Sequence, residues 1–177
     1  MVLVDWQIRE AIEKGYIKVD PFREDLINPQ SLDIRLGDTY TKVKQTHPSY
    51  SVNPLEKSTF SDFTVTKAEY TLQPLETVLV SMLERIELAP NIMAKLMGKS
   101  SLGRLGLLNS VHAGLIDGGF VGFTTMELTN VAEYPILLTK EMRVGQFVFF
   151  ETDTPSKDYQ QVGRYLNQQA GAGSLGL

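Results

Sequence analysis

The stretch Leu32-Asp33-Ile34-Arg35-Leu36-Gly37-Asp38 decides the fold class of this chain. Apolar and polar residues alternate along it until the Gly-Asp pair, and a period of two is typical of a half-buried β-strand. The same alternation occurs just before it, at residues 16–19. Further short strands are predicted at 77–83, 92–97, 123–128, 136–138 and 146–150. Because Pro or Gly residues separate these short strands, the sequence predicts a mainly β chain folded as an antiparallel sandwich or barrel.

A short helix is predicted in front of the first strand. Asp5 is placed to cap its start, apolar residues follow at helical spacing, and Gly15 is placed to end it. Residues 46–61 combine X-Pro pairs with several serines, which predicts an excursion between strands. We therefore expect one domain over residues 1–177, with a flexible Gly-rich tail at about 168–177.

The composition excludes several kinds of site. The 177 residues contain no cysteine, so disulfides, thiolate zinc sites, iron–sulfur clusters and a cysteine nucleophile are excluded. No apolar run approaches the roughly 20 residues that cross a bilayer. The N-terminus also lacks the pattern of a signal peptide, so we expect a cytoplasmic protein without a membrane partner. With 17 basic against 21 acidic residues, the net charge of −4 argues against a nucleic-acid partner.

The densest functional signal is Gly98-Lys99-Ser100-Ser101-Leu102-Gly103-Arg104. Two glycines, two hydroxyls and two cations follow an apolar strand, which favours phosphate binding. A short helix starting near Ser100 would turn its free N–H groups toward an anion, and Lys99 would add positive charge. The segment is not a Walker loop, because position 93 is Met where that motif needs Gly. The alternative is a Ser-capped helix with two solvated cations.

Two acidic residues are candidates for chemistry. Asp117 lies in a Gly-rich run, where it either accepts hydrogen bonds from a sugar hydroxyl or bonds the amides of a turn. Glu127 lies in a run suited to a strand, and it faces either water or a cleft, where burial would let it exchange protons near neutral pH. A hydrolase triad of Ser100, His112 and Asp117 is disfavoured, because no G-x-S-x-G elbow surrounds the serine.

Taken in order, four motifs resemble the dCTP deaminase branch of the dUTPase-related superfamily. They are Gly98-Lys-Ser-Ser-Leu-Gly-Arg-Leu-Gly-Leu107, Ala113-Gly-Leu-Ile-Asp-Gly-Gly-Phe120, Met126-Glu-Leu128 and Val144-Gly-Gln146. The strand at 32–37 and the late run Arg164-Tyr-Leu-Asn-Gln168 also match, so the resemblance covers nearly the whole chain. Plain dUTPases share the Ser-rich loop and the Ile-Asp turn, but they are shorter and lack the N-terminal helix and strand.

The resemblance implies a homotrimer of distorted antiparallel β-barrels, of the dUTPase-like β-clip or jelly-roll type. It implies a short N-terminal helix, a few small helices and active sites between neighbouring subunits. The main activity implied is hydrolytic deamination of dCTP to dUTP and ammonia, in the supply of dUMP and dTTP precursors. The substrate would carry Mg²⁺ on its triphosphate, the protein would bind no zinc and have no metal ligands of its own, and dTTP would act as feedback inhibitor.

The resemblance also implies roles for individual residues. The catalytic residues would be Glu127 as general acid/base, Ser100 and Arg104 beside the reacting ring, and Ala113, whose carbonyl holds the attacking water. The substrate-binding residues would be Lys99, Ser100, Ser101, Leu102, Gly103, Arg104, Asp117, Thr125, Met126, Glu127, Gln146, Tyr159, Arg164 and Gln168. Lys99 and Ser101 match triphosphate ligands, and Asp117 matches a deoxyribose ligand. The backbone of 125–127 would pair with the pyrimidine edge.

Two of these positions depart from the family pattern. Arg164 stands where a Lys is more familiar, and both cations hold phosphate, although with different geometry. Tyr159 lies closer to Arg164 in sequence than is usual in the family.

The chemistry of cytosine deamination agrees with this reading. Replacing the amine at C4 of cytosine by oxygen needs an activated water, a proton for the ring nitrogen and a proton for the leaving ammonia. Zinc deaminases activate the water with a metal held by His and Cys ligands, which a chain without cysteine cannot build. One carboxylate must then take a proton from water and return it, and we expect Glu127 beside Arg104 to do so.

Residues next to Ala113 bear on the reaction product. Gly114 and Leu115 are closer to family members that go on to cleave dUTP to dUMP than to deaminase-only members, and a glycine there leaves room for a second water that Asp117 could orient. His112 stands where Thr is more familiar and could alter dTTP control, the pH optimum or base preference. Three functions stay open: a dCTP deaminase with or without dUTP diphosphatase activity, a dUTPase alone, and a nucleotide-binding regulator without turnover.

Overall fold

The computed structural model describes residues 1–48, 51–110, 114–157 and 159–175. Its strands are β1 Ile17–Asp20, β2 Ile27–Asn28, β3 Ser31–Gln45, β4 Phe60–Thr66, β5 Glu69–Leu72, β6 Thr77–Leu88, β7 Ile92–Gly98, β8 Leu107–Ser110, β9 Leu115–Ile116, β10 Val121–Asn130, β11 Ile136–Thr139 and β12 Arg143–Glu151. Its α-helices are α1 Asp5–Glu13, α2 Ser100–Gly103 and α3 Tyr159–Val162. Two 3-10 turns lie at Glu24–Leu26 and Lys57–Thr59.

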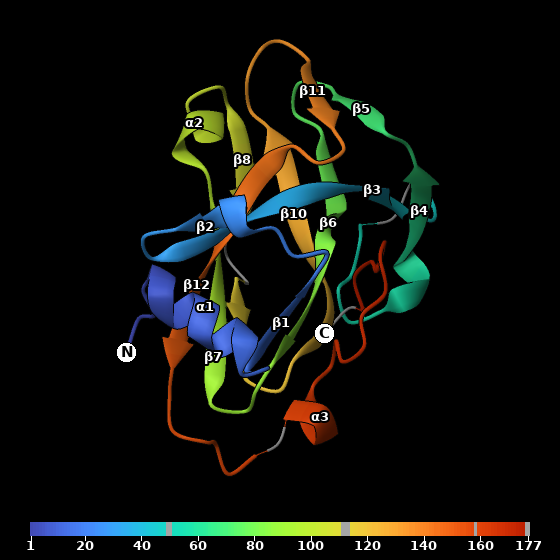
Figure 1. Cartoon of the computed structure of the whole chain (residues 1–177). Helices are drawn as coiled ribbons and strands as arrows, with labels where there is room; N and C mark the ends of the chain where they lie inside the picture. Colours follow the sequence, from blue (N-terminus) through green and yellow to red (C-terminus); the bar gives the residue numbers. More distant parts are fainter. Residues whose placement is uncertain (49–50, 111–113, 158, 176–177) are drawn as a thin grey trace.

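The strands form one large antiparallel sheet and one small one. In the large sheet, neighbouring strands follow the order β8-β10-β6-β3-β12-β7-β9, with β1 also on β6 and with β2 and β4 also on β3. The small sheet pairs β11 with β5. Figure 1 shows the large sheet curling around the core, with α1 lying across one side. Because the described residues do not pair β8 with β9, the expected distorted antiparallel barrel is present as a half-barrel, and the mainly β prediction is confirmed.

Alternating burial along the strands builds the core and orients the remaining side chains. In β10, Met126 and Leu128 are buried, while Thr125 and Glu127 on the opposite face are partly exposed. β6 and β12 also direct alternate apolar side chains inward, including Val80 of β6. This alternation turns the Glu127 carboxylate away from the core.

The start of α1 differs from the prediction. Asp5 does not cap the helix: Val4 precedes it, and the Val4 N–H donates to Gln7 Oε1 at 3.1 Å. Asp5 lies in the first turn, where a negative charge is favourable, and accepts a hydrogen bond from Arg9 Nη1 at 2.9 Å. Gly15 has φ +75 and ends the helix as expected.

The deciding strand is longer and more deeply buried than its pattern suggested. β3 continues past Gly37 to Gln45, because its register against β6 shifts between Leu36 and Tyr40 instead of ending there. A Cβ at Gly37 would lie 2.6 Å from the Ser81 carbonyl oxygen, so the glycine permits a close approach of two strands. The Gly-Asp pair thus marks an irregularity within one strand.

The polar residues of β3 are also buried, so the strand is not half-buried as predicted. Arg35 is 5% exposed, and its Nε donates to Glu84 Oε1 at 2.7 Å. The Arg35 backbone N–H donates to Glu84 Oε2 at 2.8 Å. Asp33 is 2% exposed and accepts hydrogen bonds from Asn28 and Lys99. The burial of Asp33 and Arg35 is tolerated because each of these charged side chains has hydrogen-bond partners.

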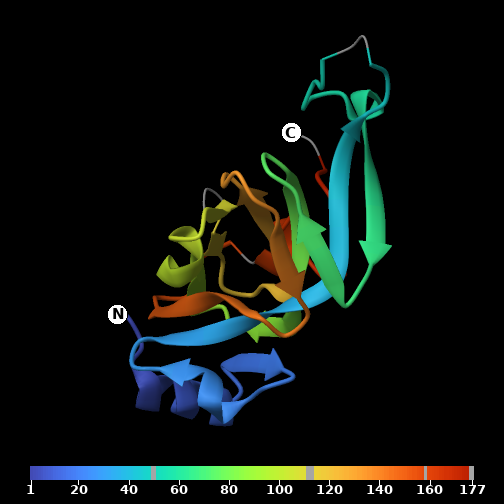
Figure 2. The same cartoon turned by 90° about the horizontal axis from the view of Figure 1, so that it is seen from above.

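β3 and β4 form a long hairpin that projects from the half-barrel (Figure 2). The predicted excursion at residues 46–61 corresponds to the connection between these strands and the first residues of β4. The sequence did not predict β4 or β5, since most residues of β4 are exposed and β5 is only four residues long. No helix among the described residues is long and apolar enough to span a bilayer.

Candidate active site

A cavity of about 290 Å³ lies where β10, β9 and the turn that follows β9 meet the C-terminal part of the chain. This volume is near the lower end of the ~300–1,000 Å³ typical of ligand pockets. The cavity is lined by Leu79, Leu96, Leu115, Ile116, Asp117, Phe120, Thr124, Thr125, Glu127, Tyr159, Tyr165, Gln168, Ala172, Gly173 and Ser174. Six residues singled out from the sequence therefore lie around one cavity: Leu115, Asp117, Thr125, Glu127, Tyr159 and Gln168. We call it the Glu127 cavity.

The strand β10 gives Glu127 its direction. Its neighbours Met126 and Leu128 are 2% and 1% exposed and point into the core, so the Glu127 side chain points to the other face. On that face Glu127 lies opposite Leu79 of β6, which also lines the cavity. Of the two orientations that the sequence left open, the structure has the one in which the carboxylate faces a cleft.

The edge of β10 next to Glu127 offers backbone groups to a ligand. The Phe123 N–H donates to the Gln168 carbonyl oxygen at 2.9 Å on this edge. Because alternate residues of a strand direct their N–H and C=O groups to the same edge, those of Thr125 face it too. β8 pairs no further along this edge than Glu127, and the C-terminal segment bridges β10 only at Gly122. The described residues thus place no strand opposite Thr125, where one donor and one acceptor can read a base edge.

The C-terminal segment docks on the start of β10. The Asn167 N–H donates to the Val121 carbonyl oxygen at 2.8 Å, and Gln168 Nε2 donates to Thr125 Oγ1 at 2.5 Å. A Cβ at Gly122 would lie 2.8 Å from the Gln168 backbone nitrogen, and Gly122 has φ +149. Glycine at this position therefore allows the segment to approach β10 closely.

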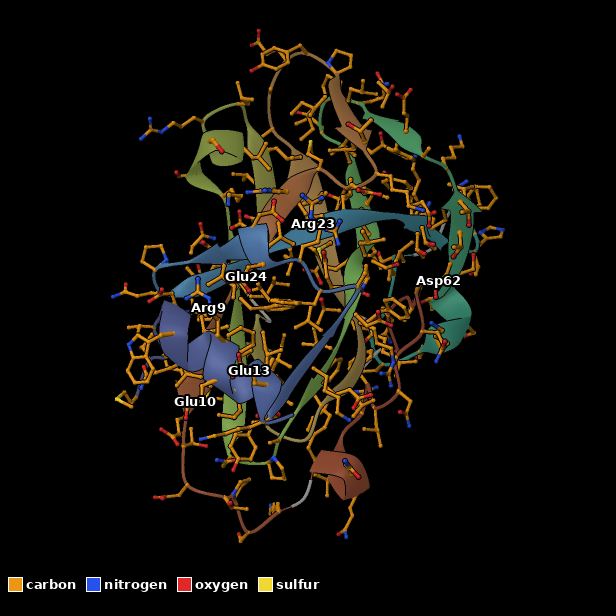
Figure 3. The ribbon with its side chains drawn as sticks, in the orientation of Figure 1. Arg9, Glu10, Glu13, Arg23, Glu24 and Asp62 are labelled. Atoms are coloured by element: carbon orange, nitrogen blue, oxygen red, sulfur yellow. The ribbon has the colours of Figure 1, made fainter. Side chains whose placement is uncertain are left out.

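Residues 171–174 then run along the β3–β4 hairpin and close one side of the Glu127 cavity. Thr41 Oγ1 donates to the Gly171 carbonyl oxygen at 3.0 Å, and the Gly171 N–H donates to Ser81 Oγ at 2.9 Å. Lys57 Nζ donates to the Ser174 carbonyl oxygen. Figure 3 labels Asp62 on the hairpin, and a Cβ at Gly173 would meet its carboxylate. The predicted flexibility of the tail stays a prediction.

The phosphate-binding candidates lie elsewhere. Residues 100–103 form α2 as expected, but no residue from Gly98 to Arg104 lines the Glu127 cavity. Lys99 Nζ donates to the buried Asp33 at 2.6 Å. Figure 1 shows α2 and α3 at opposite ends of the molecule, and Tyr159 of α3 lines the Glu127 cavity.

The register of β8 shows how far apart these two groups are. Glu127 lies opposite Ser110, and Asn130 lies opposite Leu107. Three residues of strand cover about 10 Å, and α2 with Arg104 lies beyond Leu107. Neither Ser100 nor Arg104 lines the Glu127 cavity of the same chain.

Four further candidate residues do not line the Glu127 cavity. Gln146 Oε1 accepts a hydrogen bond from Ser31 Oγ at 2.9 Å. Arg164 Nη2 donates to the Leu175 carbonyl oxygen at 3.1 Å and does not line the Glu127 cavity. The Met126 side chain is buried, so only its backbone is available. The Gly114 carbonyl accepts from the Leu96 N–H at 2.7 Å, which ties the loop before Leu115 to β7. His112 and Ala113 lie outside the described residues.

The Glu127 cavity is lined by both aromatic and polar side chains. Burial raises the pKa of Tyr159, whose ring lies 6.1 Å from that of Phe120. Thr124 Oγ1 is buried with no hydrogen-bond partner among the described residues, so a ligand or water could satisfy it. Among all residues that the structure describes, no group of three His, Asp or Glu side chains could hold a metal ion.

The sequence did not identify several lining residues. Thr124 and Tyr165 lie within stretches that the sequence singled out but were not named as site residues, and residues 172–174 carry no motif, because their placement depends on how the C-terminal segment returns to β10. The weak signal available was the run of small residues from Ala170, since only small residues fit this closely against Asp62 and the threonines of the hairpin.

Known proteins similar to this chain include several that are named dCTP deaminases. The profile described as dCTP deaminase-like matches residues 2–152. A protein of Methanospirillum hungatei named "dCTP deaminase, dUMP-forming" is 39% identical over 173 residues, which cover 96% of this chain and 92% of that protein. Proteins of the same name from Tropheryma whipplei and Corynebacterium glutamicum are 40% and 42% identical, covering 99% and 89% of this chain and 92% and 84% of their own length.

A solved structure shares the fold. The 2'-deoxycytidine 5'-triphosphate deaminase of Agrobacterium tumefaciens superposes with a TM-score of 0.62 at 24% identity. The match covers 84% of this chain and 47% of the other, so this chain spans about half of that protein. The similarity concerns the arrangement of the half-barrel, and it agrees with the fold expected from the sequence motifs.

Proposed function

Because this chain belongs to the dCTP deaminase-like family, we propose that it converts dCTP to dUMP, ammonia and diphosphate. The family resemblance read from the four sequence motifs is thereby confirmed. The relatives named above are called dUMP-forming. Their name supports the combined reaction, which the sequence offered as an alternative, over deamination that stops at dUTP.

The observation that carries the proposal is the position of Glu127 beside the backbone edge of Thr125, opposite which the described residues place no strand. A carboxylate is held in a cavity by a rigid strand, two residues from a donor and an acceptor that face the same edge. Cytosine presents a complementary donor and acceptor on its own pairing edge. Backbone pairing at Thr125 would therefore fix the ring, and Glu127 would reach the atoms that gain and lose protons.

Glu127 moves the protons of the deamination. Its carboxylate takes a proton from water, the resulting hydroxide forms a bond to C4, and N3 of the ring receives the proton. Glu127 then takes the proton of the new C4 hydroxyl and gives it to the amine. As the C4=O bond forms, the C4–N bond breaks and ammonia leaves with the electron pair of that bond. The residue ends ionised, as it began, so it acts as general base and then as general acid.

The second step would use Asp117 and the loop at Gly114. Asp117 lines the Glu127 cavity and is exposed, so it can hold a water. That water attacks the α-phosphorus, the bond to the β-phosphate oxygen breaks, and diphosphate leaves with dUMP as the other product. Leu115, 60% exposed, also lines the cavity. We propose that Gly114 and Leu115 leave the room that this second water needs.

A neighbouring copy of the chain would supply the phosphate-binding half of the site. Neither Ser100 nor Arg104 lines the cavity that Glu127 of the same chain lines. Apolar side chains are exposed around α2 and the edge strand β8, namely Leu105 54%, Leu108 47% and Val131 50%. Exposed apolar groups beside an open sheet edge are typical of an interface. We therefore propose a homotrimer with sites between subunits.

In this assembly, Lys99 and Ser101 would hold the triphosphate of the neighbour's nucleotide. The nucleotide would bring its own Mg²⁺, which is part of the substrate. Asp33 already fixes the Lys99 ammonium at 2.6 Å, so the cation is oriented before a ligand arrives. Gln146, Arg164 and the feedback ligand dTTP remain parts of the proposal that binding experiments can test.

One incubation tests the proposed function. Purified protein is incubated with dCTP and Mg²⁺, and the products are separated by ion-exchange chromatography, with ammonia and diphosphate measured in parallel. We expect dUMP, ammonia and diphosphate in equal amounts. Accumulation of dUTP without diphosphate would support deamination alone. Turnover of dUTP but not dCTP would indicate a dUTPase, and binding without any product would indicate a regulator.

A further inference from the structure

A second cavity lies on the β3–β4 hairpin, away from the Glu127 cavity. It has a volume of about 140 Å³ and is lined by Tyr40, Lys42, Lys44, Phe63, Val65, Lys67 and Tyr70. Tyr40 and Lys42 alternate with Thr41 along β3, so they point to the opposite face. Thr41 bonds the C-terminal segment at Gly171. The second cavity, which we call the hairpin cavity, is therefore on the face of the hairpin that this segment leaves free.

Three lysines line the hairpin cavity, and among the described residues only one of them is paired with an acidic side chain. Lys42 is paired with Glu76 and lies 5.6 Å from the centroid of the Tyr70 ring. Lys44 lies 4.7 Å from the centroid of the Phe63 ring and has no acidic partner in the described part of the chain. The Lys67 ammonium likewise forms no hydrogen bond or ion pair with residues that the structure describes. Two ammonium groups beside one small cavity are thus available to an anion.

The cavity also has a buried donor that lacks a partner. Tyr40 is 1% exposed, and its hydroxyl forms no hydrogen bond with any described residue. Its ring stacks on Tyr70, with 4.6 Å between centroids and 20° between planes, so it cannot turn aside freely. Burial raises the pKa of Tyr40 to about 12, so the group keeps its proton and can donate. A buried hydroxyl without a partner is unfavourable unless something else accepts from it.

We propose that the hairpin cavity binds a small phosphate-class oxyanion, held by Lys44 and Lys67 and by the hydroxyl of Tyr40. The size sets the class of ligand: 140 Å³ is well below the ~300 Å³ of pockets that hold a whole nucleoside. It suits free phosphate or the phosphoryl end of a phosphorylated metabolite. The long side chains of Lys42 and Lys44 lie over aromatic rings at this site, and they can turn their ammonium groups toward the anion.

Calorimetric titration with inorganic phosphate tests this site, with chloride at matched ionic strength as the reference. We expect phosphate to bind the native protein and to bind Lys67→Gln and Tyr40→Phe at least about tenfold more weakly, because each loses one direct bond to the anion. Lys14→Gln on α1 removes the same charge far from the hairpin and should bind phosphate normally. Glycerol 3-phosphate is titrated in parallel, and tighter binding than phosphate identifies an esterified ligand as the source.

The nucleotide site needs its own control, since Lys99 could also bind phosphate. Phosphate binding that persists in Lys99→Gln and is lost in Lys67→Gln supports the proposal. Binding lost in Lys99→Gln and kept in Lys67→Gln overturns it, as does equal weakening in Lys14→Gln or the lack of any phosphate signal above chloride. Tyr40→Phe should be at least as stable to heat as the native protein without phosphate, because it removes a buried hydroxyl that has no partner.

Discussion

Mixing two inactive variants in one oligomer should restore activity. The variants are Glu127→Gln, which removes the proposed general acid/base, and Arg104→Gln, which removes the cation proposed to act beside the reacting ring. About 10 Å of strand separates Glu127 from the start of β8, and Arg104 lies further on in the same chain. Each variant alone lacks one essential group at every site, whether that group comes from its own chain or from a neighbour.

The expected recovery follows from counting sites. If Glu127 comes from one subunit and Arg104 from the next, a site is intact when an Arg104→Gln subunit supplies the glutamate and a Glu127→Gln subunit supplies the arginine. With random equal mixing in a closed ring, each condition is met half the time, so about one quarter of the sites are intact. If both groups came from the same chain, no site would be intact.

The assay is ammonia release from dCTP after subunits are exchanged. The two variants are co-expressed with different affinity tags and purified through both tags, and each variant alone is the reference. We expect recovery to approach one third of native turnover for a trimer, because the double-tag selection removes the pure oligomers, which hold no intact site, and so raises the fraction above one quarter. Turnover no higher than that of the separate variants, in oligomers shown to contain both tags, would refute the inference that the site lies between chains.

Three further outcomes are expected. Gly122→Ala should lower kcat/KM about tenfold or more, because its Cβ would press the C-terminal segment off β10; steady-state kinetics on dCTP measures this, and unchanged kinetics would contradict it. Glu84→Gln should destabilise the fold by about 3 kcal/mol in urea, since it leaves the charge of Arg35 buried without its partner; a loss below about 1 kcal/mol would show that the pair is not needed. The hydrogen bond from Lys18 lowers the pKa of Glu87. At pH values above the usual pKa of a glutamate, the pair should therefore add up to about 1 kcal/mol to the free energy of unfolding. This contribution should be lost as the pH falls through the lowered pKa. Urea curves of native protein and Lys18→Gln should therefore converge in acid.

The alternation of apolar and polar residues predicted the fold class because burial on one face leaves a period of two. It predicted the extent of β3 poorly. Gly37 allows a close approach to Ser81 within a continuing strand, and a sequence pattern does not distinguish this from a strand end. Asp33 and Arg35 were placed on a half-buried strand, whereas each is buried with a partner distant in sequence. Such pairing depends on tertiary structure and has no local signal.

The candidate site was predictable only in part for the same reason. Asp117 and Glu127 lie in short motifs whose residue types indicate their chemistry, and the structure places both at one cavity. The sequence could not show that Arg104 lies at the far end of β8, because that distance depends on the pairing of β8 with β10. It also could not place residues 172–174, which reach the cavity by running along the hairpin.

The measurement that tests the central claim most directly compares Glu127→Gln with Glu133→Gln. Glu133 is an exposed glutamate outside the cavity and serves as the matched control. Deamination of dCTP by Glu127→Gln should fall by about 10²–10⁴, the range typical of a lost general acid/base, while nucleotide binding by calorimetry stays close to native and Glu133→Gln behaves as native in both assays. Near-native turnover by Glu127→Gln would contradict the account, because the cavity would then deaminate cytosine without the carboxylate that is proposed to move its protons.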